Sequence, residues 1–201
     1  PQKFYLNFKN LITPFVNNET ERLKNNLTKI GNCHLLLLKN TALIDTVLQA
    51  AFNAAIWLYN QTQQKQLLAK NAPIAIIARG GYGREEVYFQ SDIAVQIVSK
   101  SALEDHEVKQ AEQIVKHLEY IFFHQDIFQT STSSYYVEND LLEKKLATGK
   151  LTDLFSLLES RLVVGNDNVY LEFMNIIKTA SILQKDNLLN YCYDHKNYYD
   201  V

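Results

Sequence analysis

Long stretches with helical spacing of apolar residues alternate with a few short apolar runs along this chain. The longest helical pattern runs from Leu35 to Leu68 without proline or glycine, and its apolar side chains recur at intervals of three and four residues. It predicts one long, partly buried helix. Further helices are expected over 18–30 and 102–124, and the chain is expected to be helical from about residue 140 to its end, through 140–147, 151–165, 166–180 and 181–195.

Three short segments are typical of strands instead. Residues 74–79 form a continuous apolar run between Pro73 and Gly80, 92–98 form a second run, and 126–133 alternate and are rich in β-branched residues. They predict a small mixed sheet enclosed by helices from both ends of the chain. The expected fold class is α+β and predominantly helical. We expect N-terminal helices (1–72), a central core (73–134) and a C-terminal helical region (135–201), packed as one compact unit.

Composition argues against a nucleic-acid-binding, disulfide-bonded or membrane-spanning protein. The chain has 201 residues, of which 47% are hydrophobic and 21% charged, and a formal net charge of −2, so no general positive field favours nucleic acid. Cys33 and Cys192 lie far apart in the sequence, which favours neither a zinc site nor a disulfide framework. The apolar run Leu35–Leu38 is too short to span a membrane. We therefore expect a cytoplasmic protein, and the lack of terminal features is typical of a piece of a longer chain.

The candidate chemistry gathers around a glycine-rich turn that follows the first predicted strand. Gly80, Gly81 and Gly83 are three of the six glycines, and Arg79 and Arg84 beside them are two of only four arginines. Glycine backbones can approach a ligand closely, and their N–H groups can bind phosphate oxygens, which arginine also binds well. A carboxylate opening the next strand can hold Mg²⁺ against such phosphates. The predicted phosphate-binding residues are Gly80, Gly81, Gly83, Arg84 and Ser91, and the predicted metal ligand is Asp92.

Two stretches carry a resemblance to a known family. The order GGYGR, Glu86 and Ser91-Asp92-Ile93 resembles the signature of the protein-PII uridylyltransferases and of related nucleotidyltransferase-like proteins often fused to CBS domains, within the DNA polymerase β-like nucleotidyltransferases. Leu151–Gly165, which contains Arg161, resembles a second segment of that family. The resemblance implies a nucleotidyltransferase-type sheet and a turn that grips a triphosphate. It also implies two Mg²⁺ ions held by a D-x-D pair and by a third carboxylate on a neighbouring strand.

The chain departs from that pattern at the metal ligands. The second aspartate of D-x-D falls on Ala94, which shares a strand face with Asp92 because side chains at i and i+2 point the same way. The third carboxylate falls on Ile127. Asp126 is one residue away and faces the other side of a regular strand, unless a bulge turns it. The pattern predicts that Ala94→Asp raises the Mg²⁺-dependent affinity for nucleotide.

Three functions remain open from the sequence. The first is a nucleotidyltransferase-like domain that is impaired or inactive and retains nucleotide binding. The second is an active enzyme that uses Asp92 with Asp126, Glu85 or Glu86 and Mg²⁺ to transfer a nucleoside monophosphate from a triphosphate to a protein or small acceptor. The third is a protein-interaction module that needs no cofactor. The glycine turn, Arg84 and Asp92 are expected to line one cleft, unless Arg84 pairs with a nearby acid and only holds the turn.

Overall fold

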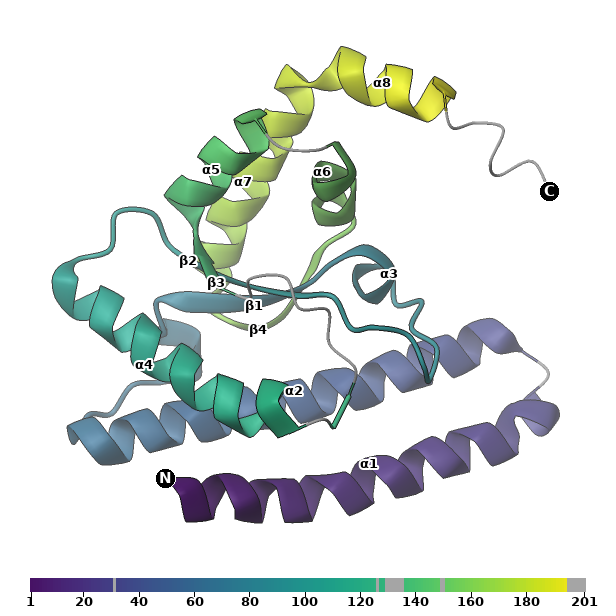
Figure 1. Ribbon diagram of the computed structural model, residues 1–201, viewed down its shortest axis with the longest axis vertical. Coiled ribbons are helices and arrows are strands. Elements are labelled where there is room, and N and C mark those ends of the chain that lie inside the picture. The colour runs from purple at the N-terminus through teal and green to yellow at the C-terminus, as the bar shows by residue number, and fades with distance from the viewer. Residues whose placement is uncertain (31, 126, 129–135, 149–150, 195–201) are drawn as a thin grey trace.

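A four-stranded mixed sheet lies between two layers of helices (Figure 1). The computed structural model describes residues 1–30, 32–125, 127–128, 136–148 and 151–194. The strands are β1 (Ile74–Ala78), β2 (Val95–Ser99), β3 (Tyr136–Glu138) and β4 (Arg161–Gly165), in the order β3-β2-β1-β4. β1 is antiparallel to both β2 and β4, whereas β3 is parallel to β2. The predicted α+β, predominantly helical fold class is confirmed.

The helices divide between the two faces of this sheet. One layer holds α1 (Gln2–Ile30), α2 (Cys33–Gln63) and α4 (Asp105–Ile121), and the other holds α5 (Asn139–Thr148), α6 (Leu151–Leu158) and α7 (Asp167–Leu183) (Figure 1). α8 (Lys185–Asp194) follows α7, α3 (Gly80–Gly83) is a single helical turn after β1, and 3₁₀ turns occupy Ala69–Asn71 and Phe123–Gln125.

The central strands are buried on both faces, which explains their unbroken apolar runs. Along β1, Ile76 packs into the core formed with α2 and α4, whereas Ile77 packs into the core formed with α6 and α7. Ile97 and Val98 divide between the same two cores along β2. Each face therefore has its own hydrophobic core, and the sheet is the wall that the two cores share.

α2 is the main support of the first core. The Asn32 side chain accepts a hydrogen bond from the backbone N–H of Leu35 at its start, and Gln64 adopts the left-handed conformation at its end. Among the described helices, α2 is long and apolar enough to cross a membrane. Half of its apolar stretch is buried inside this structure, and the core helix of a globular domain has the same length and composition.

Several predicted elements need correction. The prediction of helix through 151–165 is wrong at its end, because Arg161–Gly165 pairs with β1 as strand β4. The first helix begins at Gln2 rather than near residue 18. Of the predicted strand 126–133, residues 127–128 form a bend and the others lie outside the described residues, whereas the strand beside β2 is the later β3. The division into segments at 72 and 134 stays a prediction.

Candidate functional site

The glycine turn lies at the end of the sheet where β1 finishes. Arg79 continues the extended backbone of the strand, with φ −135° and ψ 164°, and Gly80 then turns the chain with φ +56°. The turn is closed by hydrogen bonds from the N–H of Gly83 to the Arg79 carbonyl (3.2 Å) and from the N–H of Arg84 to the Gly80 carbonyl (3.0 Å). A left-handed φ explains why glycine occupies the first position of the turn.

The other two glycines of the turn differ in what their surroundings require. A Cβ at Gly83 would lie 1.9 Å from the backbone oxygen of Glu159, so this glycine is needed for the close approach of the residues that follow α6. At Gly81 the nearest atom to an added Cβ, the Glu86 carbonyl oxygen, lies 3.7 Å away, which is an ordinary contact, and its φ is not left-handed. Neither backbone conformation nor packing within the described residues therefore requires glycine at position 81.

Arg84 is held by acids. Its guanidinium donates to Glu86 (2.7 Å) and to Glu159, and all three side chains are exposed. The hydrogen bond to Glu86 raises the pKa of Arg84, and Glu159 adds to the effect. The pairing of this arginine with a nearby acid, which the sequence left open, is thus the arrangement observed, and Arg84 ties the turn to the end of α6.

A second arginine, Arg161, is linked to the turn through Asp45. Arg161 donates two hydrogen bonds of 2.9 Å to the two carboxylate oxygens of Asp45, and the Tyr82 hydroxyl donates to the same carboxylate at 2.6 Å. Burial raises the pKa of Tyr82 well above its usual value, so this hydroxyl stays protonated. Asp45 was not among the predicted site residues, because its role depends on partners far away in the sequence.

In the segment that precedes β2, Ile93 is buried in the core formed with α2 and α4, whereas Asp92 is exposed and Ala94 is partly buried. Side chains alternate between the two faces along an extended chain, so we infer that Asp92 and Ala94 point away from that core. Ser91 closes a local turn, because its hydroxyl accepts a hydrogen bond from the N–H of Tyr88 at 3.2 Å. Asp92 and position 94 therefore share a face, and the alanine leaves Asp92 without its expected neighbour.

The described residues do not fit a pair of Mg²⁺ ions. No group of three acidic, histidine or cysteine side chains with the geometry of a metal site occurs among them. Glu86 is engaged by Arg84 at 2.7 Å, and Glu85 lies 3.8 Å from the guanidinium of Arg161. Asp126 lies outside the described residues. Two-metal chemistry requires carboxylates that hold both ions, and among the described residues Ala94 occupies the position where the second of them is expected.

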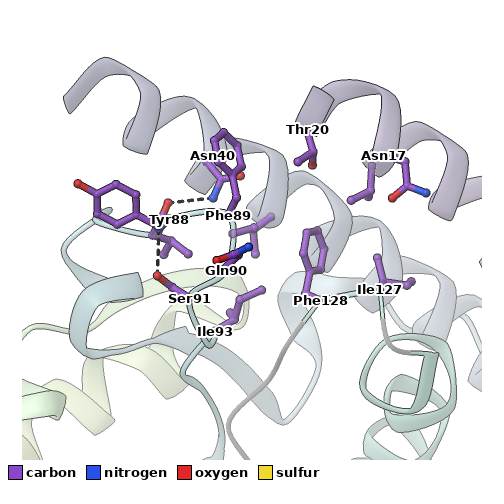
Figure 2. A pocket seen from close by; sticks show the side chains of 13 residues that line it. Asn17, Thr20, Asn40, Tyr88, Phe89, Gln90, Ser91, Ile93, Ile127 and Phe128 are labelled. Atoms are coloured by element: carbon purple, nitrogen blue, oxygen red, sulfur yellow. Dashed lines mark hydrogen bonds between the residues drawn. The ribbon is translucent and has the colours of Figure 1, made fainter. Parts of the chain in front are cut away.

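The larger of the two described cavities, about 610 Å³, lies on the other side of this segment (Figure 2). It opens between α1, α2, the 87–93 segment and residues 127–128, and the side chains of Asn17, Gln90 and Phe128 are among those that surround it. None of its described lining residues carries a formal charge. Among those described residues Ser91 is the only predicted site residue, so this cavity is not the expected cleft of glycine turn, Arg84 and Asp92.

Comparison with known proteins gives a partial relationship. No family model matches the chain. One curated protein, the bifunctional uridylyltransferase/uridylyl-removing enzyme of Pseudomonas fluorescens (strain SBW25), is 29% identical over 137 residues. The chain resembles part of a uridylyltransferase. The match takes in 68% of this chain and 13% of that enzyme, so it supports a nucleotidyltransferase-like relationship and leaves the activity of the whole enzyme a matter for proposal.

Proposed function

We propose that this chain is a nucleotidyltransferase-like domain that binds a nucleoside triphosphate at the glycine turn without transferring its nucleotidyl group. The observation that carries the proposal is Gly81, whose surroundings accept a side chain although the position has none. A glycine that neither folding nor packing requires is what a close-approaching ligand needs, because a Cβ would occupy the ligand's space. Similarity to part of a uridylyltransferase supports a triphosphate as that ligand.

The lack of transfer follows from the metal ligands. In two-metal phosphoryl chemistry the ions stabilise charge on the attacking and leaving oxygens, an effect worth several kcal/mol. With Ala94 in place of a bridging carboxylate, that stabilisation is lost, and we expect the rate to fall by several powers of ten. An active enzyme using Glu85 or Glu86 would first have to release them from Arg161 and Arg84.

Equilibrium titration tests this proposal directly. The wild-type chain is titrated with UTP, ATP, GTP and CTP to millimolar concentration in the presence of Mg²⁺, with isothermal calorimetry as the readout. Two variants accompany it: Gly81→Ala in the turn, and Gln90→Ala in the uncharged cavity as the matched control. Pyrophosphate release is followed in the same samples.

The expected result is binding of at least one triphosphate by the wild type, weakened about tenfold or more, or at least about 1.4 kcal/mol, by Gly81→Ala and unchanged by Gln90→Ala. No pyrophosphate is expected. Absence of binding by the wild type would overturn the proposal and favour the interaction module. Loss of binding in Gln90→Ala alone would move the site to the uncharged cavity, and pyrophosphate release would establish the active enzyme.

A further inference from the structure

Arg79 and Ala94 lie opposite each other, one residue beyond the paired ends of β1 and β2. The register of β1 and β2 pairs Ala78 with Val95, so the next pair is Arg79 with Ala94, and the N–H of Arg79 donates to the Ala94 carbonyl at 3.1 Å. Directly opposite residues of an antiparallel pair have their Cβ atoms about 4.5–5.5 Å apart on the same face. The residue facing the missing carboxylate is therefore an arginine.

The face that carries this pair is fixed by its neighbours in the two strands. Ile77, two residues before Arg79, packs into the core formed with α6 and α7, and the extended backbone of Arg79 continues the alternation. Ile93 and Val95, on either side of Ala94, pack into the opposite core. Arg79 and Ala94 thus share the face on which Asp92 is exposed.

The charge at this position has the opposite sign from that of a metal-binding carboxylate. An aspartate at 94 would attract a divalent cation, whereas the Arg79–Ala94 pair presents a guanidinium and a methyl group, and a guanidinium repels Mg²⁺. Burial lowers the pKa of Arg79, and the nearby Asp153 opposes that change. An arginine remains protonated at neutral pH under such shifts. Its planar set of donors matches the oxygens of a phosphate group.

We infer that the guanidinium of Arg79 takes the place of the divalent cations at this site, so that the triphosphate binds without Mg²⁺. This inference rests on the proposed function, because it concerns how the same ligand is held. The phosphate oxygens accept hydrogen bonds from Arg79, and Gly81 leaves the space for their approach. On this inference the described residues lack the carboxylates for two Mg²⁺ ions because Arg79 supplies the positive charge that the phosphates need.

The test measures UTP affinity by calorimetry in EDTA and again in excess Mg²⁺. Wild type, Arg79→Gln, Arg79→Lys and the control Arg22→Gln are compared, with far-UV circular dichroism to verify folding. Arg22 is the control because it is an exposed arginine of α1 that pairs with Glu19 and is no part of the glycine turn. Arg79→Lys retains the charge and covers the case in which Arg79→Gln fails to fold.

We expect the wild type to bind UTP equally, within about twofold, in EDTA and in Mg²⁺. Arg79→Gln is expected to weaken binding about tenfold or more in both buffers, Arg79→Lys less, and Arg22→Gln little. Binding that requires Mg²⁺ would overturn this inference and leave the proposed function standing. Equal loss in Arg22→Gln and Arg79→Gln would also overturn it, and absence of UTP binding in both buffers would overturn the two together.

Discussion

Asp45 and Arg161 form a two-bond ion pair between residues 116 positions apart, with 2.9 Å for each bond. The pair joins α2 to the start of β4, and the Tyr82 hydroxyl of the glycine turn binds the same carboxylate. The Arg161 guanidinium also lies over the Tyr82 ring, 5.2 Å from its centroid. Three elements that are distant in the sequence are therefore fixed to one another beside the proposed site.

Asp45→Ala should lower the free energy of unfolding by about 2–4 kcal/mol, because it leaves a partly buried guanidinium and a buried hydroxyl without their acceptor. Urea denaturation measures the change. Glu19→Ala is the control, because it breaks the surface pair of Glu19 with Arg22 and should cost less than about 1 kcal/mol. Equal losses in the two variants would show that the Asp45 pair contributes no more than a surface pair.

Alanine substitutions at two glycines of the turn should differ in their effect on stability, because packing requires Gly83 and does not require Gly81. Gly83→Ala should cost about 1–3 kcal/mol or more, because the new methyl group would meet the Glu159 backbone at 1.9 Å. Gly81→Ala should change stability by no more than about 0.5 kcal/mol. Thermal and urea denaturation give both values, and a large destabilisation by Gly81→Ala would remove the reason for assigning that glycine to a ligand.

The strands were predictable to different degrees. The apolar run before Gly80 identified β1 because a buried strand needs apolar residues on both faces. The sequence predicts helix at β4 because RLVVG follows a helical pattern, and a short apolar run cannot be assigned by periodicity alone. β3 contains only three residues, Tyr136–Glu138, which is too short to leave a periodic signal.

The site was predictable where it is local in sequence. The glycine turn could be identified from its glycines and the flanking arginines, and the missing carboxylate at Ala94 from the resemblance to the family pattern. The roles of the arginines could not, because each depends on partners supplied by the fold: Arg84 on Glu159, Arg161 on Asp45 and Arg79 on its position opposite Ala94. Register and long-range pairing decide these contacts, and neither is encoded in a single motif.

Restoring the second aspartate alone should not restore metal binding. In Ala94→Asp the new carboxylate would face Arg79 and pair with it, so triphosphate affinity should fall and remain independent of Mg²⁺. The double variant Arg79→Val/Ala94→Asp should bind triphosphate only with Mg²⁺. Calorimetry in EDTA and in Mg²⁺ distinguishes the two, and Mg²⁺-dependent binding by the single variant would instead support the expectation from sequence alone.

Asp153→Asn should strengthen triphosphate binding by about two- to fivefold, the effect expected for removal of one exposed acid that competes for Arg79. Asp105→Asn, at the start of α4, is the matched control and should leave the affinity unchanged. UTP titration in EDTA provides the measurement. Unchanged or weaker binding in Asp153→Asn would argue against Arg79 as the group that holds the phosphates.

The most direct test of triphosphate binding at the glycine turn is a ¹H–¹⁵N NMR titration of the wild-type chain with UTP in EDTA. We predict that the backbone amides of Gly80, Gly81 and Tyr82 and the side-chain Nε–H of Arg79 shift with a common dissociation constant. The amides of Asn17 and Gln90 at the uncharged cavity should not shift. Shifts confined to Asn17 and Gln90, or no shifts at millimolar UTP, would contradict triphosphate binding at the glycine turn.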